Sequence, residues 1–141
     1  KSYPNINENI NLSEYGLFGS GNELTIISYG NGFYLSMKSK REIEQKIHKK
    51  IKIIDLRWLT DINYSKLIKE IEQSKKILIV DECRKSGCFG ESIFNNISSS
   101  INGTVKLHAA ENSFITIGES STFTLPSEKS IAEEALALIN A

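Results

Sequence analysis

The sequence of 141 residues has few of the residues on which many functional classes depend. It holds two cysteines and two histidines, too few for a disulfide framework and a poor fit to a zinc site. No apolar run approaches the roughly 20 residues that a membrane-spanning helix needs. Seventeen basic and seventeen acidic residues cancel. The neutral balance gives no reason to expect nucleic acid or an acidic membrane as a partner.

The chain also lacks the common catalytic motifs. It has no Ser-His-Asp order, no Walker loop and no cluster of metal ligands. Cys83 has no neighbouring histidine to activate it as a nucleophile. A disulfide to nearby Cys88 would be strained or regulatory, so we predict free thiols in a reducing cytoplasm. From the residues alone, this is a domain without a complete active site.

The most informative segment spans residues 77–91 and reads ILIVDECRKSGCFGE. Its apolar start is typical of a central parallel strand, which is buried on both faces. Two carboxylates, Asp81 and Glu82, follow, and then comes a loop with two glycines before a helical pattern. In open α/β sheets, ligands and partners bind at this end of the strands. The segment therefore predicts both the fold class and the functional edge of the sheet.

Strand and helix patterns alternate along the chain. Ser127 and Asn63 are expected to cap helices. Alternation of this kind is the signature of a parallel sheet covered by helices on both sides. A further strand near 15–18 could pair as an antiparallel edge. The expected strands are 24–29, 51–56, 77–82 and 104–108, and the expected helices are 33–49, 63–73, 89–99 and one after residue 127.

A glycine pair at Gly30 and Gly32, with Asp55 ending the next strand, imitates a dinucleotide-binding fingerprint. That fingerprint needs a third small residue for close packing of the helix on the strand. Leu35 stands at that position and would push the helix away. The pattern therefore favours a plain turn from strand to helix.

The other candidate residues favour structural roles. Asp81 and Glu82 point to opposite faces of a strand, so they are not a facing catalytic pair. We expect one of them to accept hydrogen bonds from the following loop or its basic residues. Arg57 is expected to pair with Asp55, Glu82 or a neighbouring subunit. Trp58 fits either a core or an interface, and the apolar stretch 114–118 is typical of a loop that packs on another domain.

Five motifs in this order resemble the carboxyl-terminal domain of the transketolase superfamily. They are most similar to the β part of thiamine-diphosphate-dependent 2-oxo acid dehydrogenases, the decarboxylating first component. Asp81 and Cys88 depart from the family pattern, which has His and Gly there. The resemblance covers residues 15–141 and leaves 1–14 as a linker from an upstream domain. The motifs are ELTIISYGNGFYLS, IKIIDLRWL, KKILIVDECRKSGCFGESI, ENSFITIG and LPSEKSI.

The resemblance implies a three-layer α/β/α fold with a mostly parallel five-stranded sheet and one antiparallel edge strand. It implies an assembly and partner-docking role in an enzyme that decarboxylates a 2-oxo acid oxidatively and transfers the acyl group to lipoyl. Thiamine diphosphate and Mg²⁺ are bound in that family by other domains, through a G-D-G…N segment that is absent here. The domain alone is therefore expected to bind neither and to be inactive.

The implied partners are other domains or subunits of the same enzyme, a dihydrolipoyl acyltransferase and a second copy of the chain. The expected location is the cytoplasm, or an organelle matrix in a eukaryote. Glu111 is the expected acidic contact for a basic docking module. The interface candidates are Arg57, Trp58, Glu82, Phe89, Glu111 and Phe114.

Two alternatives stay open at this point. The equivalent domain of transketolase or deoxyxylulose-phosphate synthase would carry a phosphate-binding Arg or His in its crevice. A free-standing regulatory module that binds a small molecule would have a deep apolar pocket at the strand ends.

Overall fold

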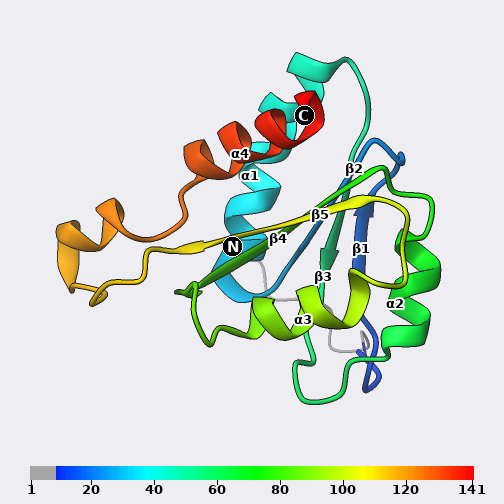
Figure 1. Ribbon diagram of the computed structural model, residues 1–141, viewed down its shortest axis with the longest axis horizontal. Coiled ribbons are helices and arrows are strands. Elements are labelled where there is room, and N and C mark those ends of the chain that lie inside the picture. The colour runs from blue at the N-terminus through cyan, green and yellow to red at the C-terminus, as the bar shows by residue number, and fades with distance from the viewer. Residues whose placement is uncertain (1–8) are drawn as a thin grey trace.

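The computed structural model describes residues 9–141, so most of the predicted linker 1–14 lies outside the described residues. The chain forms one sheet between two helical layers (Figure 1). The strands are β1 (Gly16–Gly19), β2 (Leu24–Ser28), β3 (Lys52–Asp55), β4 (Lys76–Arg84) and β5 (Thr104–Ala110). The helices are α1 (Gly30–Ile47), α2 (Tyr64–Ile71), α3 (Phe89–Ile97), the short 3-10 helix η1 (Gly118–Phe123) and α4 (Glu128–Asn140).

The five strands are ordered β1-β3-β2-β4-β5. β1 runs antiparallel to β3, and the other neighbouring strands are parallel. The predicted three-layer fold with one antiparallel edge strand is confirmed. In parallel strands the carboxyl ends meet at one edge of the sheet. The ends of β2, β3 and β4 therefore form a common rim.

The sheet is buried on both faces. Helices α1 and α4 cover one face, and α2 and α3 cover the other (Figure 1). Alternate residues of β4 belong to opposite cores: Leu78 and Val80 face α1 and α4, whereas Ile77 and Ile79 face α2 and α3. This is the period of two that strand geometry imposes, and it explains the uninterrupted apolar run in the sequence.

Helix α1 lies close to the sheet because small residues face it. A Cβ on Gly32 would lie 2.6 Å from the Ser28 Oγ. Ser36 and Ser39 are fully buried, and their hydroxyls donate to backbone carbonyls of the same helix. Leu35 packs at the side of the core. The expectation that its bulk would hold the helix away is therefore wrong.

Both predicted caps are confirmed. The Asn63 side chain accepts a hydrogen bond from the Lys66 amide at 3.0 Å, and Ser127 forms a reciprocal capping box with Ser130. Strand β4 runs two residues further than expected, because Arg84 pairs with Ala110 beyond an irregularity after Asp81. The sequence pattern predicted that this strand would end with the two carboxylates, Asp81 and Glu82.

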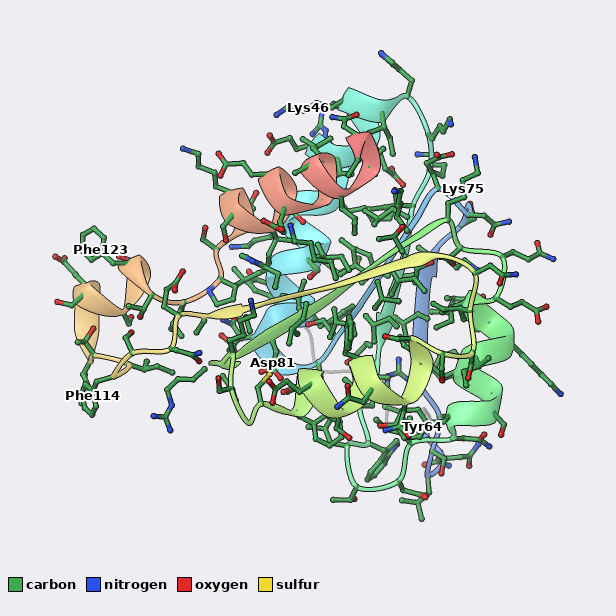
Figure 2. All side chains as sticks on the ribbon, viewed as in Figure 1. Lys46, Tyr64, Lys75, Asp81, Phe114 and Phe123 are labelled. Carbon is green, nitrogen blue, oxygen red and sulfur yellow. The ribbon has the colours of Figure 1, made fainter. Side chains whose placement is uncertain are left out.

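Residues 111–125, named here the arm, leave the body between β5 and α4 (Figure 1). Phe114, Ile117 and Phe123 on the arm are 82%, 95% and 87% exposed. Figure 2 shows Phe114 and Phe123 projecting from the tip of the arm, away from the sheet. None of the helices of residues 9–141 is long and apolar enough to cross a membrane.

Candidate functional site

The Asp81 carboxylate is the centre of the rim formed by the strand ends. It is 1% exposed and accepts three hydrogen bonds from three parts of the chain. The Tyr29 hydroxyl donates at 2.6 Å, the Cys83 amide at 2.8 Å and the Gly90 amide at 2.7 Å. The expected anchoring to loop amides is confirmed. One side chain thus joins the end of β2, the end of β4 and the start of α3.

The surroundings of Asp81 and Tyr29 fix the protonation state of each of these two side chains. Burial raises the pKa of Asp81, but the hydrogen bonds from Tyr29, Cys83 and Gly90 outweigh burial and lower it. Burial, together with the hydrogen bond to Asp81, raises the pKa of Tyr29 far above its ordinary value. Asp81 is therefore ionised and Tyr29 protonated at neutral pH. Neither is poised for proton transfer near pH 7, so the pair anchors the rim.

Two further interactions surround this anchor. The Asn31 side chain donates to the Glu82 carboxylate at 2.6 Å, which links the start of α1 to β4. The rings of Tyr29 and Phe89 meet edge to face with centroids 6.0 Å apart. Glu82 and Phe89, both predicted from the sequence, therefore lie on the same rim as Asp81. Asn31 and Tyr29 were missed, although Tyr29 is the last residue of a predicted strand and Asn31 lies in the turn after it.

Arg57 lies at the end of β3, on the same edge of the sheet. Its Nε is 3.6 Å from the Asp55 Oδ2, which confirms one of its three expected partners. Burial raises the pKa of Asp55, although the neighbouring Arg57 opposes the rise. The Arg57 guanidinium also packs so closely on Gly16 of β1 that a Cβ on Gly16 would lie 2.6 Å from the Arg57 Nη2. β1 thereby holds Arg57 in place.

Trp58 is partly exposed, and its indole Nε1 is buried without a hydrogen-bond partner among residues 9–141. Glu111 and Phe114 are both exposed on the arm, and Figure 2 shows Phe114 at the tip of the arm, apart from Asp81. The six predicted interface residues thus divide between two places, the rim and the arm. Ile117 and Phe123 complete the apolar side of the arm. Phe123 was missed because a single aromatic among Ser and Thr carries little signal.

A hollow of about 530 Å³ lies between α3 and β5. Apolar side chains of Phe94, Val105 and Leu107 alternate there with the charged side chains of Lys85 and Glu91. It lies alongside the outer strand β5 and reaches the carboxyl end of β4 at Lys85. Its lining mixes charged with apolar side chains, so it is not the deep apolar pocket that a small-molecule module would need.

The family model of the transketolase C-terminal domain matches residues 17–123. The chain belongs to this family. Asp55, Arg57, Glu82 and Phe89 all lie within the matched range, as do β2, β3, β4 and β5. The rim described above is therefore part of a transketolase C-terminal domain.

Curated relatives of this transketolase C-terminal domain include two staphylococcal proteins. The chain is 24% identical over 134 residues to the pyruvate dehydrogenase E1 component subunit beta of Staphylococcus epidermidis, covering 92% of this chain and 41% of that protein. It is 23% identical to the same subunit of Staphylococcus aureus, covering 89% and 40%. The chain thus spans about two fifths of the length of these relatives.

Solved structures share the fold. A split-gene transketolase, described as an inactive beta4 tetramer, superposes with a TM-score of 0.77 at 14% identity, covering 94% of this chain and 44% of that one. The 2-oxoglutarate:ferredoxin oxidoreductase of Magnetococcus marinus, solved with 2-oxoglutarate, coenzyme A and succinyl-CoA, gives 0.64 at 12% identity, covering 89% and 20%. At these identities the likeness is one of fold.

Thiamine diphosphate with Mg²⁺ is the cofactor that the resemblance implies for the parent enzyme, and this transketolase C-terminal domain alone is expected to bind neither. In residues 9–141 no three His, Cys, Asp or Glu side chains are grouped to hold a metal ion such as Mg²⁺. Arg57, a cation at the rim, is paired with Asp55. The absence of thiamine diphosphate and Mg²⁺ binding therefore stays a prediction.

Proposed function

We propose that this domain assembles and docks a thiamine-diphosphate-dependent 2-oxo acid dehydrogenase first component. The parent reaction would be oxidative decarboxylation of a 2-oxo acid with acyl transfer to lipoyl. The relatives named as pyruvate dehydrogenase E1 beta subunits support this reading, since the match covers 92% of the chain. The anchored rim, whose central pair is not poised for proton transfer, also suits a supporting role better than catalysis.

The exposed apolar side chains of the arm are the observation that carries the docking role. Phe114, Ile117 and Phe123 are at least 82% exposed, although they stand within ten residues of one another. Burying apolar surface contributes about 25 cal/mol per Å², so leaving three such side chains in water is unfavourable. Grouped exposed apolar residues mark interaction sites. The arm is therefore assigned to contact another subunit or domain of the same enzyme.

The rim supplies a second, more polar contact. Trp and Arg are the residue types that most often dominate binding energy at protein interfaces. Trp58 is partly exposed at the end of β3 and can contact a partner through the exposed part of its ring, although its indole N–H is itself buried. Arg57 is held by Asp55 and keeps part of its guanidinium exposed. Together with Glu82 and Phe89, these residues would form the polar side of the assembly surface.

Glu111 is proposed as the contact for a basic module of the dihydrolipoyl acyltransferase. Its side chain is exposed where the arm leaves β5. Its amide donates to the Thr124 carbonyl at 3.1 Å, and this hydrogen bond joins the two ends of the arm at its base. A carboxylate on a fixed backbone position suits an electrostatic contact better than one on a loose loop.

Analytical ultracentrifugation of the 141-residue chain tests the assembly role. The wild-type chain should associate as its concentration rises into the millimolar range. The triple variant F114S/I117S/F123S should stay monomeric with an unchanged circular dichroism spectrum. The matched control is Tyr34→Ser, which removes a half-exposed aromatic from the outer side of α1 and should leave association unchanged. A wild-type chain that remains monomeric throughout would contradict the proposal.

A further inference from the structure

Cys83 and Cys88 are not used by the proposed function, yet the fold places them together. Cys83 belongs to the end of β4, and Cys88 precedes the first residue of α3 as its N-cap. Both thiols are free. The four residues between them form the connection from strand to helix.

A shared carboxylate holds the two ends of this connection together. The Cys83 amide donates to the Asp81 Oδ1, and the amide of Gly90, two residues after Cys88, donates to the Asp81 Oδ2. Segment 83–90 is therefore folded back onto one side chain. Each thiol lies beside that carboxylate, and Cys88 is among the groups whose charge acts on the Cys83 thiol.

The connection itself is fixed in this turned shape. The Ser86 amide donates to the Asn112 side chain at 2.9 Å, and the Gly87 amide donates to the Glu91 carboxylate at 2.7 Å. Gly87 has φ +80°, a conformation that glycine adopts without strain. A covalent link between the two cysteines would therefore close a loop that is already bent, at a small additional cost in chain entropy.

The two thiols differ in access. Cys83 is exposed, whereas Cys88 is 6% exposed. An oxidant in solution therefore reaches Cys83 before it reaches the buried Cys88. An exposed thiol next to a second thiol that can resolve its oxidised form is the arrangement of a redox-responsive cysteine pair.

We propose that Cys83 and Cys88 form a reversible dithiol–disulfide site, with a peroxide as the oxidant. The Cys83 thiolate attacks one oxygen of hydrogen peroxide. The O–O bond breaks, and the departing hydroxide takes a proton to leave as water. The Cys88 thiolate then attacks the sulfenic acid sulfur, the S–O bond breaks, and a second water leaves. Two thiols and one peroxide thus give one disulfide and two waters, and a small dithiol reverses the change.

The surroundings set the rate of this reaction. Burial and the Asp81 carboxylate raise the pKa of both thiols. Asp81 and Glu82 on β4 and the Tyr29 hydroxyl beyond β2 are the titratable neighbours of Cys83, besides Cys88. Little thiolate is therefore present at neutral pH, and the oxidation should accelerate as the pH rises towards 9.

Mass spectrometry of the reduced 141-residue chain after dilute hydrogen peroxide tests the site. The wild-type chain should lose two hydrogen atoms, and peptide mapping should join Cys83 to Cys88. Cys88→Ser should stop at a Cys83 sulfenic acid that dimedone traps. Cys83→Ser should lose its remaining thiol at least about tenfold more slowly, because the Cys88 sulfur is buried.

Other products would overturn the proposal. One is oxidation of Cys83 to sulfinic acid while Cys88 remains open to alkylation after unfolding. Another is a disulfide that joins two chains instead of closing one. Because Cys83 is exposed, the C83S variant should fold even if C88S does not. The rate at which C83S loses its Cys88 thiol is then compared with the rate at which the wild-type chain loses the same thiol. Equal rates would contradict the proposed disulfide site.

Discussion

The Tyr29 hydroxyl donates a hydrogen bond to the buried Asp81 carboxylate at 2.6 Å and joins the ends of two neighbouring strands. The same carboxylate also holds the loop after β4 and the first turn of α3. The rim therefore has one central acceptor with three donors. Its removal should affect the whole carboxyl edge of the sheet, since each donor would lose its partner at once.

Asp81→Ala should lower the free energy of unfolding by about 2–4 kcal/mol, because one buried and two partly buried donors are left without an acceptor. Tyr29→Phe removes one donor and should cost about 1 kcal/mol. Urea denaturation followed by circular dichroism measures both. Glu82→Gln is the control, since the amide oxygen can still accept from Asn31. Equal losses for D81A and E82Q would contradict the central role of Asp81.

Glu44 makes the stability of the fold depend on acidity. Burial raises its pKa, but hydrogen bonds from Lys40, the Ile51 amide and Lys50 prevail and lower it from 4.5 to about 2. A carboxyl group whose pKa is lower in the folded chain than in the unfolded chain stabilises the protein at pH values above the unfolded pKa. That contribution is lost as the pH falls from about 4.5 towards 2.

Glu44→Gln should therefore cost about 1–2 kcal/mol at pH 7 and almost nothing near pH 2. Thermal unfolding at a series of pH values measures the difference between variant and wild type. Glu133→Gln is the matched control, because Glu133 is 65% exposed in a helix-surface pair with Lys129 at 3.8 Å. A cost for E44Q that is independent of pH would show that charge is not the cause.

Titration calorimetry of the chain with thiamine diphosphate and Mg²⁺ should give no binding heat. The reason is that the residues from 9 to 141 group no set of side chains fit for the metal, and the sequence has no G-D-G segment. Titration with Mg²⁺ alone provides the baseline. Saturable binding in the micromolar range would refute the prediction and make the domain a cofactor site in its own right.

Glu111→Lys should weaken binding to a purified dihydrolipoyl acyltransferase by at least about tenfold, because a charge reversal turns an attraction into a repulsion. The loss should shrink as salt is added. Surface plasmon resonance measures both effects. Glu119→Lys, on the same arm and also exposed, is the control for net charge. Unchanged affinity of E111K would remove this residue from the docking surface.

Local sequence determined much of this protein. The buried strand β4 follows from an apolar run too short for a helix, and the caps at Asn63 and Ser127 follow from side chains that bond within three residues. Such features depend on neighbours in the chain, so a pattern read along the chain is enough to predict them.

Tertiary structure decided the rest. Asp81 and Tyr29 are far apart in sequence, and only the parallel pairing of β2 with β4 brings their side chains within hydrogen-bonding distance. The arm carries no periodic pattern, because its Phe114, Ile117 and Phe123 are exposed and do not pack on either core of residues 9–141. Strands and caps were therefore set by local chemistry, whereas the rim and the arm depend on distant segments that are placed only when the sheet forms.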